Sequence, residues 1–337
     1  MDKSYRQNFT VQYCFPGNNA SCRKQVRSDP AYIFLLIFLS CISVCTVILN
    51  LLVIISISHF KQLHTPTNLL ILSLAAADLL VGMFVMPVQI TQLKDSCWYY
   101  GEMACSIFEI STGYSTAASL CSLVLIAVDR YIAVSDPLHY PTRITVSKMT
   151  LFIILGWSFS VMYITIFFYF NHDLLKSQTV TSCYGECAAI VKDSWVIIDL
   201  VVCFVAPCSL ILILYLRVFN AARRQAKSVR SVTNAFSQRH KPARSPETKA
   251  AKTLGLVIFG YLACYIPFYV SSLTVESVTT LSVVLNVFSW LIYINSSVNP
   301  LIYAIFYPWF RTSVKIIVTC RIFQSSSSRL KLLSESF

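Results

Sequence analysis

Three carboxylates interrupt long apolar stretches of this sequence: Asp78, Glu109 and Asp199. A carboxylate in apolar surroundings is costly unless a cation or hydrogen-bond donors compensate it. The seven apolar stretches of the chain contain no histidine, lysine or arginine, and the three acids fall at different depths. They therefore form no convergent catalytic or metal-binding set. We predict that the protein is not an enzyme and needs no cofactor, and we expect one acid to take its cation from solution.

The seven stretches are the elements that must position these acids. The chain has 337 residues, of which 56% are hydrophobic and 12% charged, whereas a soluble protein carries roughly 25% charged residues. A run of about 18 or more apolar residues is typical of a membrane-spanning helix. The stretches are 31–57, 67–90, 106–128, 150–170, 195–216, 253–273 and 281–306. We predict an all-α fold in which a tail (1–30) precedes a seven-transmembrane helix bundle (31–306).

The basic residues are distributed unevenly between the two ends of these stretches. The net charge is +12, and with the N-terminal tail outside, nineteen of the 27 Lys and Arg fall on the inner side. An excess of Lys and Arg marks the cytoplasmic side, so we predict a multi-pass plasma-membrane protein with an extracellular N-terminus. The basic inner face suits anionic membrane lipid and an acidic partner protein rather than nucleic acid. Asn8 and Asn19 begin N-glycosylation triplets in the outer tail.

The triplet Asp129-Arg130-Tyr131 stands at the inner end of the third stretch. Arg130 can pair with Asp129, and Glu247 at the start of the sixth stretch could pair with it across the inner face. A charge pair that closes two helix ends is a two-state latch, which breaks when the sixth helix moves outward. We therefore interpret this end of the bundle as a conformational switch.

The triplet belongs to an ordered pattern along all seven stretches. Its other landmarks are Asn50, Asp78, Trp157, Pro207, Tyr215, Pro267 and the run Asn299-Pro300-Leu301-Ile302-Tyr303. The pattern resembles that of the rhodopsin-like (class A) G-protein-coupled receptors over the whole membrane region. The resemblance implies coupling to a heterotrimeric G protein, with the switch residues Asp129, Arg130, Tyr131, Tyr215, Glu247, Asn299, Pro300 and Tyr303. The prolines at 207, 267 and 300 each remove a helical hydrogen bond and are expected to kink their helices.

A longer run at the end of the seventh stretch narrows the resemblance. Residues 295–310 read NSSVNPLIYAIFYPWF and match every fixed position of the form NSxxNPxxYxxxYxWF, which the trace amine-associated receptors share. This resemblance implies a receptor for small amines that serves olfaction, couples to a stimulatory G protein and raises cyclic AMP. Receptor kinases and arrestin are expected to act on the serines of the tail. A receptor of the same fold for a non-amine ligand is the alternative.

The cysteines divide between the outer side, where disulfides persist, and the helices. The family resemblance implies two disulfides, Cys105–Cys187 and Cys22–Cys183. Cys14 and Cys97 are left over, and whether they bond each other stays open. Cys320 follows the last helix near the inner leaflet and is predicted to be palmitoylated.

Asp78 must face the interior of the bundle, because an isolated ionised carboxylate in hydrocarbon is costly. The rhodopsin-like resemblance implies that it holds a sodium ion or waters together with four residues at matching depth: Ser119, Asn295, Ser296 and Asn299. A purely structural cluster of polar side chains is the alternative.

The chain departs from the aminergic pattern at the expected ligand site. Aminergic receptors hold the ligand ammonium with an aspartate eighteen residues before the arginine of the triplet, where this chain has Thr112. The fifth stretch offers Asp199 instead, eight residues before Pro207 and so about two turns outward. We predict that Asp199 is the ammonium counter-ion, and some fish members of the resembled family look similar. The alternative is that hydroxyls and water satisfy Asp199.

Glu109 and several aromatic side chains could complete this site. Glu109 precedes Thr112 by three residues, nearly one turn outward on the same side of the helix. If both acids face the site, the ligand would be a diamine; otherwise Glu109 lies at the rim. Aromatic rings attract cations, and the candidates for an aromatic cage are Tyr265, Phe268, Tyr269, Trp290 and Tyr293. Receptors of this type commonly have Trp in place of Tyr265 and Phe in place of Tyr261.

The inner segments suggest further contacts with membrane and partner. Residues 217–252 are rich in Arg and Lys, which is typical of a solvated, partly disordered connector that borders the G protein. Residues 307–318 are predicted to form a short amphipathic helix on the membrane, at the start of the segment 307–337. The chain shows no internal repeat and no polar stripe along the stretches, so neither a transporter nor a channel is predicted.

Overall fold

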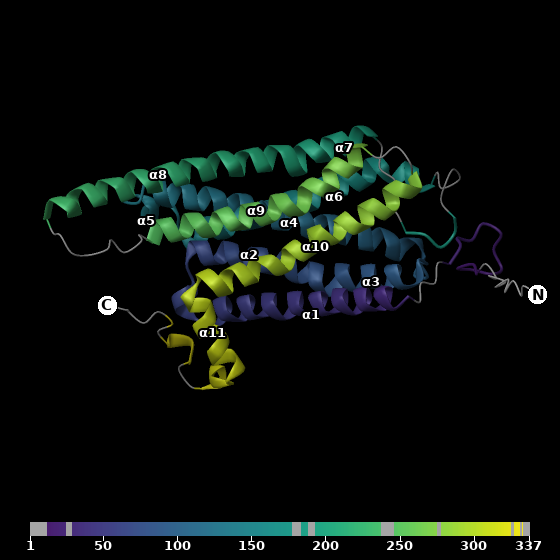
Figure 1. Cartoon of the computed structure of the whole chain (residues 1–337), viewed down its shortest axis with the longest axis horizontal. Helices are drawn as coiled ribbons and strands as arrows, with labels where there is room; N and C mark the ends of the chain where they lie inside the picture. Colours follow the sequence, from purple (N-terminus) through teal and green to yellow (C-terminus); the bar gives the residue numbers. More distant parts are fainter. Residues whose placement is uncertain are drawn as a thin grey trace, which may run out of the picture.

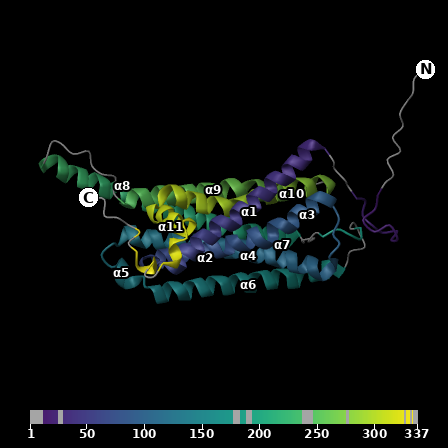
Figure 2. The ribbon, with the colours of Figure 1, turned by 90° about the horizontal axis from the view of Figure 1, so that it is seen from below.

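The computed structural model describes residues 12–24, 29–176, 183–187, 193–236, 246–274, 278–324, 327–330 and 332. Its long helices run side by side along one axis (Figure 1). We call the end that carries residues 12–24 the disulfide end and the opposite end, where α11 lies, the Arg130 end (Figures 1 and 2).

Each predicted stretch lies within one continuous helical segment of the structure. The segments are α1 (Pro30–His59), α2–η2–α3 (Pro66–Leu80, Val81–Val85, Met86–Asp95), α4 (Gly101–Ser135), α6 (Val146–Lys176), α7–η3–α8 (Asp193–Asp199, Leu200–Val205, Ala206–Phe236), α9 (Pro246–Thr274) and α10 (Val278–Phe306). Short helices α5 (Tyr140–Arg143) and α11 (Pro308–Val318) accompany them. In the described part of the chain, six helices are long and apolar enough to cross a membrane, or seven when the bent pair of α10 and α11 counts as one span.

Two spans contain a π-helical segment, and each segment lies just before a proline. Val81–Val85 precedes Pro87, and Leu200–Val205 precedes Pro207. A proline cannot bond to the carbonyl four residues earlier and its ring clashes with that carbonyl, so a wider turn relieves the strain. Pro267 and Pro300 lie inside α9 and α10. The predicted distortion at Pro207 therefore takes the form of an extra residue in one turn.

Helix α11 turns sharply away from α10, by 101°, and crosses the bundle end (Figure 1). Tyr307, between the two helices, has φ −106° and ψ 107°, because a residue before proline is driven out of the helical region. Trp309 and Phe310 on α11 are buried against the end of α1. The predicted amphipathic helix is therefore present and is anchored to the bundle by its aromatic side chains.

The connector predicted to be partly disordered is largely helical. Helix α8 continues to Phe236 and projects beyond the bundle, and α9 begins at Pro246. Alanine, arginine, glutamine and lysine in this segment are good helix formers, so solvation does not prevent the helix from extending. Residues 217–236 and 246–252 of this connector are thus helical, and residues 237–245 lie outside the described residues.

The outer surface of the bundle is apolar, as lipid contact requires. Phe34, Phe259 and Ile305 are among the large hydrophobic residues that stay exposed. An apolar groove of about 550 Å³ on this surface is lined by Leu36, Cys45 and Ile90, among others, with Lys94 at its polar end. None of the three intramembrane acids lines this groove, so it is not the candidate ligand site.

Candidate functional site

Asp199 ends α7 and links three helices through its carboxylate. The Tyr163 hydroxyl on α6 donates to Oδ1 at 2.9 Å, and the Tyr269 hydroxyl on α9 donates to Oδ2 at 3.1 Å. The residue is only partly buried, and no lysine, arginine or histidine of the described residues forms an ion pair with it. A carboxylate can accept about four hydrogen bonds. Two tyrosines thus orient Asp199 and leave its charge without a cation.

The π-helical segment Leu200–Val205, which follows Asp199, is also linked to α9. Because Pro207 has no N–H, the carbonyl of Cys203 lacks its usual helical donor. The Tyr261 hydroxyl on α9 donates to this carbonyl at 3.3 Å. The Tyr261 ring stacks on Tyr265, with ring centroids 4.1 Å apart. The departure from the common Phe at Tyr261 therefore has a structural role, since its hydroxyl satisfies a carbonyl that the proline frees.

Replacing Tyr261 with phenylalanine should destabilise the receptor by about 1 kcal/mol, the usual net value of one hydrogen bond to a backbone carbonyl. The ring stays, so packing against Tyr265 is unchanged. Thermal inactivation of the detergent-solubilised receptor measures the effect. Tyr169→Phe is the matched control, because Tyr169 is exposed; an equal loss in both variants would contradict this role for the hydroxyl.

Glu109 and Thr112 on α4 differ in their hydrogen bonding. The Thr112 hydroxyl donates to the Phe108 carbonyl of its own helix at 2.9 Å. Glu109 is partly buried, and among the described residues its carboxylate has no hydrogen bond and no ion pair. It interacts electrostatically with Tyr293 on α10. Glu109 is therefore partly shielded from solvent, on the side of α4 that faces Tyr293.

The predicted aromatic side chains fall into two groups. Tyr269 donates to Asp199, and Phe268 packs on Tyr269 with ring centroids 5.5 Å apart. Trp290 and Tyr293 pack edge to face at 5.7 Å, near Glu109. Tyr265 is 4% exposed and stacks on Tyr261 instead. The sequence analysis missed Tyr163, the other donor to Asp199, since nothing in the spacing of the two residues points to a shared site.

Asp78 is completely buried in a cluster of polar side chains. It accepts from the Asn299 amide at 2.8 Å and from the Ser119 hydroxyl at 3.2 Å, and Ser296 lies nearby. The buried Oδ1 of Asn50 has no partner among the described residues. These are oxygen ligands of the kind that hard cations prefer, and the carboxylate charge is uncompensated, so the residues fit a sodium ion.

Asn295 is the member of the predicted cluster that lies elsewhere. It is 3% exposed, but its side-chain oxygen faces Gly260 of α9, and no contact with Asp78 is recorded among the described residues. Asn50 instead reaches the cluster, because its amide nitrogen donates to the Ser296 carbonyl at 3.1 Å.

At the Arg130 end, Arg130 pairs with its neighbour Asp129. The guanidinium donates to Asp129 Oδ2 at 2.6 and 3.0 Å and also to the Thr67 hydroxyl. The Tyr140 hydroxyl donates to Asp129 Oδ1 at 2.8 Å, and burial raises the pKa of Tyr140, so it stays a donor at neutral pH. Thr67 and Tyr140 thus complete the cluster, and the sequence pattern did not single them out.

The other predicted switch residues lie on the helices around this pair. Glu247 lies in α9, but its side chain is outside the described residues, so the predicted pair with Arg130 is not described. The hydroxyl of Tyr215 lies against Gly255 of α9, only 2.7 Å from where a Cβ would stand. Tyr131 packs against Val134 and Val218. Tyr303 is 3% exposed, in the segment between Asn299-Pro300 and α11.

Three disulfides join the segments at the disulfide end into one unit. They are Cys105–Cys187, Cys22–Cys183 and Cys14–Cys97. The first two are the pairs that the family resemblance implies, and the third joins the two cysteines for which the sequence named no partner. We call residues 12–24, 96–100 and 183–187 the disulfide cap. Backbone hydrogen bonds support it, such as Tyr184 N–H to Ala20 O at 2.7 Å and Trp98 N–H to Gly185 O at 2.8 Å. Gly185 has φ +104°, and a Cβ there would meet Phe15.

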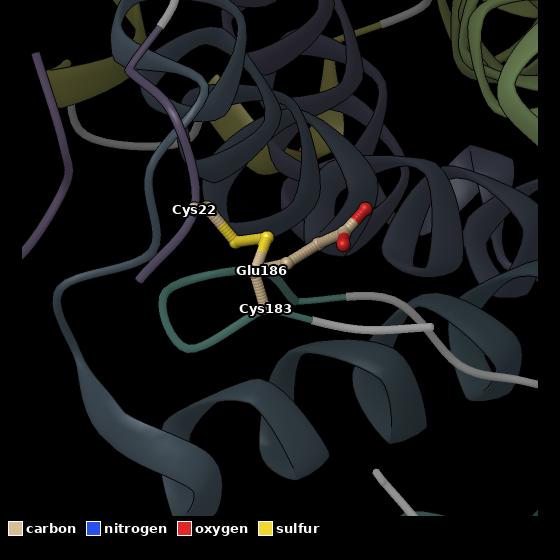
Figure 3. Close-up of side chains that lie close together, drawn as sticks. All are labelled: Cys22, Cys183 and Glu186. Carbon is tan, nitrogen blue, oxygen red and sulfur yellow. A yellow bond between two sulfur atoms is a disulfide. The ribbon is translucent and has the colours of Figure 1, made fainter. Parts of the chain in front are cut away.

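The cap brings Cys22, Cys183 and Glu186 within 4.8 Å of one another. Figure 3 shows that the two sulfurs are bonded to each other and that the Glu186 side chain extends away from them. A disulfide offers no thiolate for a metal, so this cluster is not a metal site. Asn19 is exposed in the cap, Asn8 lies outside the described residues, and Cys320 is exposed after α11.

Comparison with known proteins agrees with this architecture. Residues 49–303 match the family described as 7 transmembrane receptor (rhodopsin family). The chain is 38% identical to Trace amine-associated receptor 13c of Danio rerio, over 99% of this chain and 100% of the relative. It is 40% identical to Trace amine-associated receptor 6 of Pan troglodytes, over 96% of both chains. It is 39% identical to Trace amine-associated receptor 8b of Mus musculus, over 96% of this chain and 97% of the relative.

These matches confirm the predicted seven-transmembrane fold and the class of protein, which is a receptor and not an enzyme. The two family resemblances, one drawn from the run at residues 295–310 and one from the landmarks of the helices, are confirmed, because the matches extend over nearly the whole chain. The chain belongs to the rhodopsin family of seven-transmembrane receptors and, within it, to the trace amine-associated receptors.

Proposed function

We propose that this receptor binds the ammonium group of a small amine through Asp199. The observation that carries the proposal is the geometry of that carboxylate: two tyrosine hydroxyls orient it at 2.9 and 3.1 Å, and no described basic residue neutralises it. Thr112 stands where an aminergic receptor has its usual acid and is engaged by its own helix. The Asp199 side chain is therefore the acid best placed to attract a cation.

We also propose the orientation and the output of the receptor. The disulfide cap and Asn19 would face the outside of the plasma membrane, and the basic Arg130 end would face the cytoplasm, where Lys and Arg are enriched. The Arg130–Asp129 pair and the extended α8 would contact a stimulatory or olfactory G protein, which raises cyclic AMP. Tail serines would serve receptor kinases and arrestin, a palmitoyl group on Cys320 would anchor the end of α11 in the membrane, and the basic inner face would contact anionic lipid.

A panel of alkylamines and their matched alcohols, applied to cells that express the receptor, tests this function. An alcohol keeps the size of the amine but cannot carry its charge. We expect cyclic AMP to rise with amines only. A rise with alcohols as well would favour the alternative, a receptor of the same fold for non-amine ligands.

We further propose that the Asp78 cluster holds a sodium ion in the resting receptor. Asp78→Asn keeps the shape and removes the charge, so sodium should no longer lower agonist potency. Agonist concentration–response curves in sodium and in an organic cation measure this. In the wild type we expect a shift of roughly three- to tenfold, a coupling of about 1 kcal/mol. If Asp78→Asn kept the full effect of sodium on agonist potency, a sodium site at Asp78 would be excluded. Ser122→Ala, one turn from Ser119 on α4, is the control.

A further inference from the structure

The chain does not leave the bundle after α11 but returns to the end of α1. It turns at Cys320, which has φ +55°, and forms two short 3₁₀ helices, η4 (Arg321–Phe323) and η5 (Ser327–Arg329). Helix η5 then contacts α1 and the short helix η1 (Lys61–Leu63) that follows α1. We call residues 320–324, 327–330 and 332 the docked tail.

Ser327 is buried within the docked tail, with only 5% of the residue exposed. Its hydroxyl donates to the Ile322 carbonyl at 2.6 Å, and Nε2 of His59, at the end of α1, lies 2.9 Å from the same hydroxyl oxygen. A hydroxyl has one proton to donate, so the ring of His59 donates the second hydrogen bond. The Ser327 hydroxyl therefore links the tail to α1 as donor and acceptor at once.

Leu332 holds the other end of the docked tail. Its N–H donates to Gln62 Oε1 at 2.9 Å. Its side chain is 3% exposed and belongs to the apolar cluster that includes Phe60 and Phe310. Leu330, two residues earlier, is 43% exposed. The tail is thus held at two points, and burial of the Leu332 side chain favours the docked position.

A phosphate on Ser327 is incompatible with this arrangement. Phosphoserine has no hydroxyl proton for the Ile322 carbonyl, and it carries a charge of about −1.5 to −2 with three acceptor oxygens. Burying such a charge is costly without several donors, and His59 supplies a single N–H to the Ser327 oxygen. Phosphorylation and docking therefore oppose each other, and each weakens the other to the same extent.

We propose that Ser327 is a concealed phosphorylation site: docking hides this serine from kinases, and a phosphate on it keeps the tail released from α1. ATP supplies the phosphoryl group. The bond from its terminal phosphorus to the ADP oxygen breaks, a bond to Ser327 Oγ forms, and the base of the kinase takes the hydroxyl proton. Arg329 is exposed two residues later, so the kinase is one whose acidic groove accepts a basic residue after the serine.

The proposal rests on one part of the proposed function, the orientation that places the Arg130 end in the cytoplasm with kinases and ATP. It does not depend on which ligand the receptor binds.

The experiment incubates the purified full-length receptor in lipid nanodiscs with ATP and the catalytic domain of protein kinase C, which accepts basic residues after the serine. Mass spectrometry measures the initial rate of phosphorylation at Ser327. Leu332→Ala should raise this rate at least about tenfold, because it removes the buried side chain that favours docking. Leu330→Ala, the same substitution at an exposed position, should change it less than about twofold.

A second pair of variants leaves the sequence around the serine untouched. His59→Ala removes one hydrogen bond to Ser327 and should raise the rate about fivefold. His64→Ala is its matched control, because His64 is exposed and bonds to Ser58 instead. Equal rates in the two leucine variants, or no phosphate on Ser327 in Leu332→Ala, would overturn the proposal.

Hydrogen exchange tests the converse, that phosphate releases the tail. In the receptor phosphorylated at Ser327, the amide of Leu332 should exchange at least about tenfold faster than in the unmodified receptor, because its bond to Gln62 is lost. Slower exchange would show that phosphate tightens docking and would overturn the proposal. If Ser327 behaves as expected in the purified receptor but is never phosphorylated in cells, the proposed orientation fails and the coupling stands.

Discussion

Asp199→Asn is expected to abolish the response to amines at concentrations that saturate the wild type. Asparagine keeps the shape of the side chain: the hydroxyl of either Tyr163 or Tyr269 can still donate to its amide oxygen, and the other hydroxyl can accept from its amide nitrogen. The change therefore removes the charge and little else. Losing one partner of a partly desolvated charge pair costs about 2 to 5 kcal/mol, which corresponds to a shift of roughly 30-fold to several thousandfold in the half-maximal concentration.

Cyclic AMP curves for the wild type and Asp199→Asn, corrected for surface expression, measure this effect. Tyr163→Phe is an informative companion, because it removes one donor to Asp199 and keeps the charge; we expect a shift below about tenfold, in line with one hydrogen bond. An Asp199→Asn receptor that reaches the surface and responds with unchanged potency would show that Asp199 is structural.

The largest expected effect on stability comes from the disulfide Cys105–Cys187. It ties the start of α4 to the short segment 183–187, which also carries the Cys22–Cys183 bond. Replacing both Cys105 and Cys187 with serine removes the covalent bond between this segment and α4. Loss of a native disulfide typically costs about 2 to 5 kcal/mol. We expect most of the protein to be lost from the cell surface, as measured by antibody binding to intact cells.

The Cys14–Cys97 bond provides a matched comparison. The sequence separations of the two bonds are 83 and 82 residues, so chain entropy alone assigns them equal stabilisation. Cys14–Cys97 joins two segments of the cap and no long helix, and we expect Cys14→Ser with Cys97→Ser to retain most surface expression. Equal losses in the two double variants would indicate that loop entropy, and not attachment of the cap to α4, determines the effect. Cys320→Ser, which breaks no disulfide, controls for the substitution itself.

The helices of this fold were predictable because lipid imposes a simple requirement on sequence. Each span must be apolar over its whole length, and the seven stretches satisfy this condition without ambiguity. The position of Asp78, Asp199 and Arg130 along their helices could be predicted from the motifs around them. The predicted ends were less accurate, since α8 and α9 continue into water, where polar residues favour a helix as readily as a loop.

The side chains that pair between helices could not be predicted in the same way. Tyr163 meets Asp199, and Tyr140 meets Asp129, across helices that are distant in sequence. Helical periodicity shows which face of one helix is polar, but it carries no information on the rotation of the neighbouring helix. The Cys14–Cys97 bond stayed open for the same reason, because bonding requires the two Cα atoms to lie within about 7 Å, and they are 5.7 Å apart.

The π-helical segment Leu200–Val205 gives the fifth span an unusual sensitivity to length. In a regular α-helix each residue turns the chain by about 100°, and the wider turn absorbs one residue before Ala206. Removing a single residue from this segment would restore a regular helix and rotate everything on its disulfide side, Asp199 included, by about that angle. The direction of this carboxylate is thus encoded in spacing as well as in side chains: deleting one codon redirects Asp199 without replacing any of the side chains that we propose to bind the amine.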